Sequence, residues 1–89
     1  MAQKRGTMMI AFEILKLVIN GTGITAIVYG ANLNFNIAKT HIDRLEKKGL
    51  IAIEDLNGPT RTKLFTTTDK GLDFIDAMAT VALMWSDEV

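Results

Sequence analysis

The sequence predicts a small α+β domain in which helices are followed by a β-hairpin and a final helix. Three observations among its 89 residues support this prediction. Apolar residues recur at helical spacing in segments 7–19, 35–48 and 69–86. Two strand-like runs, 50–54 and 62–66, enclose a loop that contains Asn-Gly-Pro. Glycine and asparagine stand where the predicted helices end.

The first two predicted helices are short and are joined by a glycine-rich turn. Thr7 is the predicted N-cap of helix 7–19, and Thr25 is the predicted N-cap of a helix over 26–30. Between them, the Asn-Gly-Thr-Gly of 20–23 supplies the backbone freedom that a turn needs.

The third predicted helix is amphipathic and has clear signals at both ends. Asn34 is the expected N-cap of helix 35–48, and Gly49 is the expected stop. A 3-4-3 spacing predicts a core face made of Phe35, Ala38, Ile42 and Leu45. The residues then expected to point outward are Asn36, Lys39, Thr40, Asp43 and Lys47.

The last predicted helix begins after Thr67 or Thr68, either of which can act as its N-cap. It carries one apolar stripe made of Leu72, Ile75, Ala79, Ala82 and Leu83. A second stripe consists of Phe74, Met78, Val81 and Trp85. One stripe can cover the core, and the other needs a partner, so we expect a homodimer. The predicted dimer interface is Phe74, Met78, Val81, Leu83 and Trp85. The alternative is one wide face packed on helix 7–19 of the same chain.

This order of elements is that of a winged helix-turn-helix, with a three-helix core, a two-stranded β-hairpin wing and a C-terminal dimerisation helix. We expect one domain over 1–89, with 7–67 forming the helix-turn-helix plus wing and 68–87 the C-terminal helix. Such a domain turns helix 35–48 and the hairpin tip toward the same side, where they hold double-stranded DNA. The predicted DNA-binding residues are Asn34, Asn36, Lys39, Thr40, Arg44, Lys47, Arg61 and Lys63. The alternative interpretation is that the basic residues of helix 35–48 form only a solvent-exposed surface and bind nothing.

Charge and composition narrow the possible functions. The net charge is zero, but residues 1–67 hold nine Lys and Arg against five Asp and Glu, whereas 68–89 hold one against five. The net charge is therefore +4 over residues 1–67 and −4 over residues 68–89. This asymmetry favours a protein that turns one side toward a polyanion. The absence of cysteine excludes disulfides and thiolate metal sites, and His41 is the only histidine. We therefore expect no metal, no cofactor and no enzymatic activity. Apolar stretches are too short for a membrane span, so we expect a cytoplasmic protein.

The run IVYGANLNFNIAKTHIDRLEKKGLI resembles the small archaeal winged-helix DNA-binding proteins, in which a YGANL-type turn precedes the recognition helix. The Thr-Thr-Asp-Lys-Gly-Leu of 67–72 is similar to a segment that opens the last helix in MarR and PadR regulators. The resemblance covers residues 10 to about 77. It implies a homodimeric archaeal DNA-binding protein, either a transcriptional regulator or a chromatin protein, and the neutral charge favours the regulator. The alternative function is a winged helix that serves as a protein–protein interaction module in a transcription or replication complex.

Overall fold

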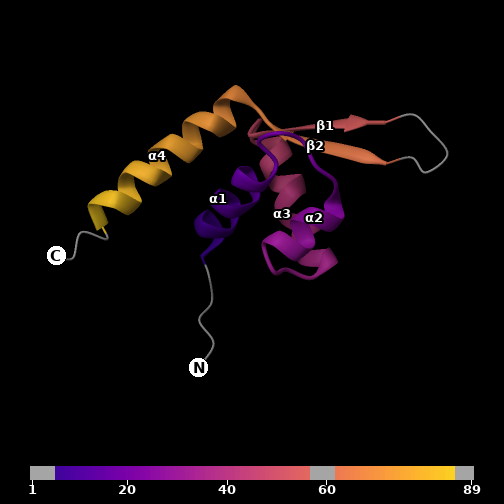
Figure 1. The fold of residues 1–89 in the computed structure, drawn as a ribbon, viewed down its shortest axis with the longest axis horizontal. Helices are drawn as coiled ribbons and strands as arrows, with labels where there is room; N and C mark the ends of the chain where they lie inside the picture. Colours follow the sequence, from indigo (N-terminus) through magenta and orange to yellow (C-terminus); the bar gives the residue numbers. More distant parts are fainter. Residues whose placement is uncertain (1–5, 57–61, 86–89) are drawn as a thin grey trace.

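The computed structural model describes residues 6–56 and 62–85, which form four helices and one two-stranded sheet (Figure 1). The elements in order are α1 (Thr7–Leu17), α2 (Ile24–Gly30), α3 (Phe35–Lys47), β1 (Ile51–Asp55), β2 (Lys63–Thr67) and α4 (Asp69–Trp85). The predicted order of elements is confirmed, and the architecture is an α+β winged helix. The hairpin and α4 extend from opposite ends of the three-helix body (Figure 1).

The predicted N-caps of the first two helices are wrong. Gly6 rather than Thr7 occupies the N-cap of α1, and Gly23 rather than Thr25 occupies that of α2. Neither glycine provides a side-chain cap. Glycine adopts the extended N-cap backbone readily, so a threonine one or two positions after a glycine does not identify the cap. The helix α1 also ends at Leu17, two residues before the predicted end.

The hairpin lies one residue later than predicted on both strands. Leu50 donates its backbone N–H to the Leu45 carbonyl at 2.9 Å, so it still belongs to the end of α3 and β1 begins at Ile51. The strands are antiparallel and pair Ile53 with Phe65. Thr22 forms a bridge to Phe65 on the other edge of β2, with N···O distances of 3.0 and 2.8 Å.

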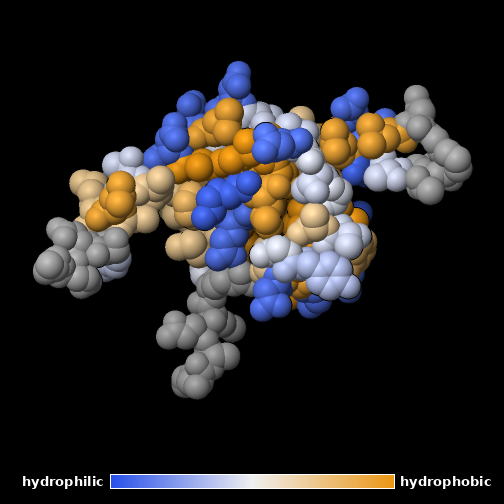
Figure 2. All heavy atoms as spheres, in the orientation of Figure 1, coloured by the Kyte–Doolittle hydropathy of each residue, from blue (hydrophilic) through white to orange (hydrophobic). Residues whose placement is uncertain are grey.

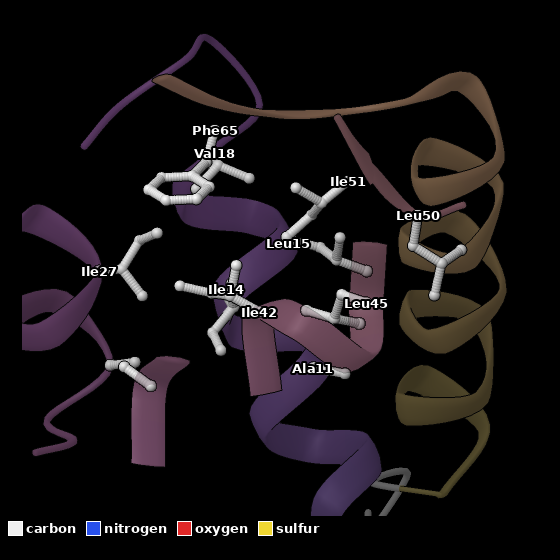
Figure 3. Close-up of a cluster of buried hydrophobic side chains, with 12 residues drawn as sticks. Ala11, Ile14, Leu15, Val18, Ile27, Ile42, Leu45, Leu50, Ile51 and Phe65 are labelled. Atoms are coloured by element: carbon white, nitrogen blue, oxygen red, sulfur yellow. The ribbon is translucent and has the colours of Figure 1, made fainter. Parts of the chain in front are cut away.

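One apolar core joins α1, α2, α3 and the base of the hairpin (Figure 3). Ile14, Leu15, Val18 and Ile27 are fully buried. The buried hydroxyl of Thr67 donates to the Leu15 carbonyl at 2.6 Å and ties β2 to α1. The core therefore holds the hairpin and α3 in a defined relative position.

The prediction that Phe35 belongs to the core face of α3 is wrong. Ala38, Ile42 and Leu45 are buried as expected, but Phe35 is 54% exposed. It occupies the first position of α3, before the helix reaches the core, and its side chain lines the groove beside the hairpin. The apolar period therefore identified the buried helix face but not where along the helix burial begins.

Thr68, and not Thr67, is the N-cap of α4, because its Oγ1 accepts a hydrogen bond from the Gly71 N–H at 3.1 Å. The two predicted stripes of α4 do not separate into a core face and a free face. Phe74 and Ile75, one from each stripe, both pack against the core. From Ala79 to Trp85 every residue is exposed, so burial instead changes along the helix.

In the described part of the chain, no helix has the length and apolar character needed to cross a membrane.

Candidate nucleic-acid interface

The exposed face of α3 is polar and mainly basic. Its buried side consists of Ala38, Ile42 and Leu45. The opposite side carries most of the predicted DNA-binding residues, and all of these are exposed: Asn36, Lys39, Thr40, Arg44 and Lys47. Side chains that share one helix face can enter a major groove together. The structure therefore brings these five predicted residues onto one surface.

The first turn of α3 is held by Asn34, as predicted. Its Oδ1 accepts a hydrogen bond from the backbone N–H of Ile37 at 2.8 Å. This cap uses the oxygen of the amide and leaves its Nδ2 group as a hydrogen-bond donor. The Thr40 hydroxyl donates to the Asn36 carbonyl at 3.0 Å. Because that bond uses the only hydroxyl proton, Thr40 is better suited to accept a hydrogen bond from DNA than to donate one to a phosphate.

The carboxyl end of α3 is fixed by its own turn. Gly49 has a φ of +78°, donates to the Glu46 carbonyl at 2.9 Å, and is followed by the bond from Leu50 to Leu45. This pair of bonds is the Schellman motif, in which glycine adopts the left-handed conformation without a steric penalty. The prediction that Gly49 ends the helix is confirmed.

A second set of contacts ties this end of α3 to α4. The Thr68 hydroxyl donates to the Gly49 carbonyl at 2.7 Å, and the Lys70 Nζ donates to the Lys48 carbonyl at 2.8 Å. The Thr68 N–H also donates to the Leu50 carbonyl at 3.1 Å. Sequence reasoning missed this role of Thr68 and Lys70. The only signal was the Thr-Thr-Asp-Lys-Gly segment itself, which pointed to a helix start but not to its partner.

A groove of about 840 Å³ runs between α3, the hairpin and the start of α2. Its lining combines apolar side chains with two lysines and one aspartate, including Phe35, Ile42, Ile53, Phe65, Lys39, Asp43 and Lys63. Lys63 is exposed at the start of β2, next to this groove. The structure therefore places Lys63 near Lys39 of α3, although they are 24 positions apart in the chain. Arg61 lies outside the described residues.

A smaller hollow of about 410 Å³ lies along the exposed side of α3 and is lined by Thr40, Asp43, Arg44, Lys47 and Lys48. Three of these five side chains are cationic and one is anionic. The hollow therefore favours anionic groups, and Asp43 moderates that preference.

His41 is a half-buried residue of α3. Burial lowers the pKa of His41 below its usual value, and the nearby Arg44 guanidinium lowers it further. The imidazole is therefore biased toward its neutral form. Among the described residues, no group of three or more His, Cys, Asp and Glu is arranged to hold a metal ion.

The residues predicted for a dimer interface divide into two groups. Phe74 packs against the core of its own chain and Met78 is half-buried. Val81 is 57% exposed, Leu83 74% and Trp85 87%. Figure 2 shows mainly apolar side chains along the outer half of α4. At 100° per residue, Val81 and Trp85 continue the line of Phe74 and Met78, whereas Leu83 lies on the other side of the helix.

Comparisons with known proteins agree with this architecture. A family model described as winged helix-turn-helix matches residues 4–85. Sso10a-2, a DNA-binding protein from Sulfolobus solfataricus, is 31% identical, with a TM-score of 0.83 over 93% of this chain and 84% of its own. A PadR family transcriptional regulator from Eggerthella lenta is 25% identical, with a TM-score of 0.78 over 86% of this chain and 74% of its own.

A third structure, AF1382 from Archaeoglobus fulgidus, is 23% identical, with a TM-score of 0.75 over 97% of this chain and 93% of its own. At that identity the likeness concerns the fold alone. No curated protein sequence matches the chain. The family model spans nearly the whole chain, and the similarity to Sso10a-2 confirms the resemblance to small archaeal winged-helix proteins. The chain belongs to the winged helix-turn-helix family.

Proposed function

We propose that this protein is a DNA-binding transcriptional regulator that acts as a homodimer. Residues 35–48 would enter the major groove, and the hairpin residues Arg61 and Lys63 would contact the DNA backbone. Residues 7–67 would form the reading unit, and residues 68–87 would join two copies. Sso10a-2 is a DNA-binding protein and the Eggerthella lenta relative is a transcriptional regulator, and these similarities support the proposal.

The observation that carries the proposal is the exposed polar face of α3. Lys39, Arg44 and Lys47 project from the same surface as Asn36, and Lys63 lies across the adjacent groove. Lysine and arginine neutralise phosphates, and an asparagine amide can bond a base edge. If α3 were only a solvent-exposed surface, there would be no reason for basic residues to lie on the neighbouring hairpin as well.

Dimerisation is supported by the outer half of α4. Val81 and Trp85 are large, exposed and aligned on one face of a helix whose inner half is already packed. Exposed apolar side chains in such a row are typical of protein interfaces. Two copies would also present two reading helices, as half-sites about one turn of DNA apart require.

The test is a fluorescence anisotropy titration of labelled, fragmented genomic duplex at low and moderate salt. We expect an affinity that falls steeply with salt, because binding neutralises phosphates and releases counterions. The variant Lys39→Glu should bind at least about tenfold more weakly. Its log–log salt slope should be smaller by about 2, one phosphate contact for each subunit of the dimer.

Lys16→Glu is the matched control, because it makes the same charge change on α1. Lys16 lies 4.3 Å from the centre of the Phe12 ring, so its loss should cost about 0.5–1 kcal/mol of stability without weakening DNA binding. Equal losses of affinity in the two variants would contradict the proposed role of α3 and indicate an effect of net charge alone.

The second candidate function is a protein–protein interaction module, which the exposed apolar residues of α4 and Met8 of α1 favour. A folded protein that binds no duplex at low salt would support this candidate and contradict the regulator.

A further inference from the structure

The first turn of α3 exposes two large apolar side chains at the point where the helix would meet DNA. Phe35 is 54% exposed and Ile37 is 44% exposed. Neither belongs to the core or to the side chains packed against it. Phe35 lines the groove beside the hairpin, and Ile37 lies on the opposite flank of the helix. Two such residues in one turn of a reading helix need a partner that the described part of the chain does not provide.

Asn36 lies between these two side chains. Successive helix residues are 100° apart, so its amide is centred between the phenyl ring and the isoleucine. The cap formed by Asn34 holds the backbone of this turn at Ile37. The result is a fixed sequence of apolar, amide and apolar groups at the amino end of α3, which is the end that contacts base edges in helix-turn-helix proteins.

This arrangement matches the chemistry of A·T pairs in the major groove. Adenine presents an N7 acceptor and an N6 donor there, and an asparagine amide bonds both. The C5-methyl group of thymine is the apolar group on the base edges of this groove. Guanine is usually read by arginine or lysine, and the first basic residue of α3 is Lys39, beyond its first turn.

The surrounding charges indicate that the partner of this apolar pair is DNA rather than another protein. Lys39 and Lys47 are exposed on the same side of α3, and lysine is depleted in the buried centre of protein–protein interfaces. A polyanion with methyl groups between its phosphate chains satisfies both the cationic and the apolar side chains.

We propose that the first turn of α3 recognises A·T base pairs, with Asn36 bonding an adenine and with Phe35 and Ile37 covering thymine methyl groups on either side. This inference rests on the proposed DNA-binding function and assigns the specificity of that surface. It makes Phe35 and Ile37 specificity-determining residues.

The test begins with selection of binding sites from a random-sequence duplex library. Each thymine of the selected half-site is then replaced singly by uracil, which removes only the methyl group. We expect A·T pairs in the half-site and at least two thymines whose replacement weakens binding about fourfold, as expected for a buried methyl group of about 0.8 kcal/mol. Ile37→Ala should abolish the sensitivity to uracil at one of these positions, and Phe35→Ala should abolish it at another.

Ile19→Ala is the matched control, because Ile19 is 40% exposed and lies in the turn after α1. The Ile19→Ala variant should lose as much affinity on each uracil replacement as the original protein does. Salt-sensitive binding to a selected site that tolerates every uracil would overturn this inference and leave the regulator intact. The same holds for a selected site without A·T pairs. No binding to any duplex would overturn both.

Discussion

Asn32 is a non-glycine residue in the left-handed conformation, with a φ of +55°. It ends α2 as Gly49 ends α3, because its N–H donates to the Tyr29 carbonyl at 3.3 Å and the next N–H, of Leu33, donates to Val28 at 3.0 Å. Asparagine tolerates this conformation better than other residues with a side chain. The left-handed backbone at this position therefore explains why the YGANL turn contains an asparagine.

Asn32→Ala should lower the free energy of unfolding by about 1–2 kcal/mol, because alanine pays the full steric cost of the left-handed conformation. Urea denaturation followed by circular dichroism measures this change. Asn32→Gly is the control, and it should stay within about 1 kcal/mol of the original protein. An alanine variant as stable as the glycine variant would show that the turn does not depend on this conformation.

At the scale of elements, the junction between α3 and α4 determines how the carboxyl end of α3 is held. Three hydrogen bonds from Thr68 and Lys70 end on the carbonyls of residues 48–50, directly after α3. Gly71 is buried directly against this junction. A Cβ atom there would collide with the Leu50 carbonyl oxygen and lie 2.5 Å from the Thr67 Cγ2. The glycine thus allows α4 to begin in contact with the end of α3.

Gly71→Ala should destabilise the protein by about 1–3 kcal/mol, because both colliding groups belong to a packed backbone or a buried side chain. Thermal unfolding measures the loss. Gly23→Ala offers a comparison, since a Cβ atom there would meet nothing closer than the Lys63 carbonyl oxygen at 3.9 Å. It should cost less than about 1 kcal/mol. Equal costs would mean that the close approach of α4 is not required.

At the scale of the whole molecule, net charge is divided along the chain, because nine of the ten basic residues precede residue 68 whereas the acidic residues are split evenly. Residues 68–89 contain five acids and one lysine, and Asp73 and Asp76 are exposed on α4. Two copies joined through α4 would bring these like charges together. Salt screens such repulsion, so the proposed dimer should tighten with salt while DNA binding weakens.

Val81→Glu and Trp85→Glu should each shift the protein toward monomers, because they place a charge in the apolar line of the outer half of α4. Sedimentation equilibrium at low and moderate salt measures the change. Thr80→Glu adds the same charge to the same helix about 100° from Val81, and it should weaken the dimer less. A wild-type protein that is monomeric at all accessible concentrations would contradict the proposed interface.

Much of the fold could be predicted because its signals are local. The cap at Asn34, the stop at Gly49 and the burial of Ala38, Ile42 and Leu45 each depend on residues within a few positions, and these predictions are confirmed. The errors at Gly6 and Gly23 were local too, because a glycine and a threonine one or two positions apart carried competing cap signals.

The sequence by itself determined the order of elements and which side of α3 is polar, since these follow from hydrophobic period and turn chemistry along the chain. Only the tertiary structure decided that Phe35 is exposed, that Lys63 lies beside α3, and that Lys70 bonds the residue after α3. Each of these depends on contacts between segments distant in sequence. Burial along α4 likewise stops where the helix extends past the three-helix body. The spacing of apolar residues within α4 does not indicate where that point lies.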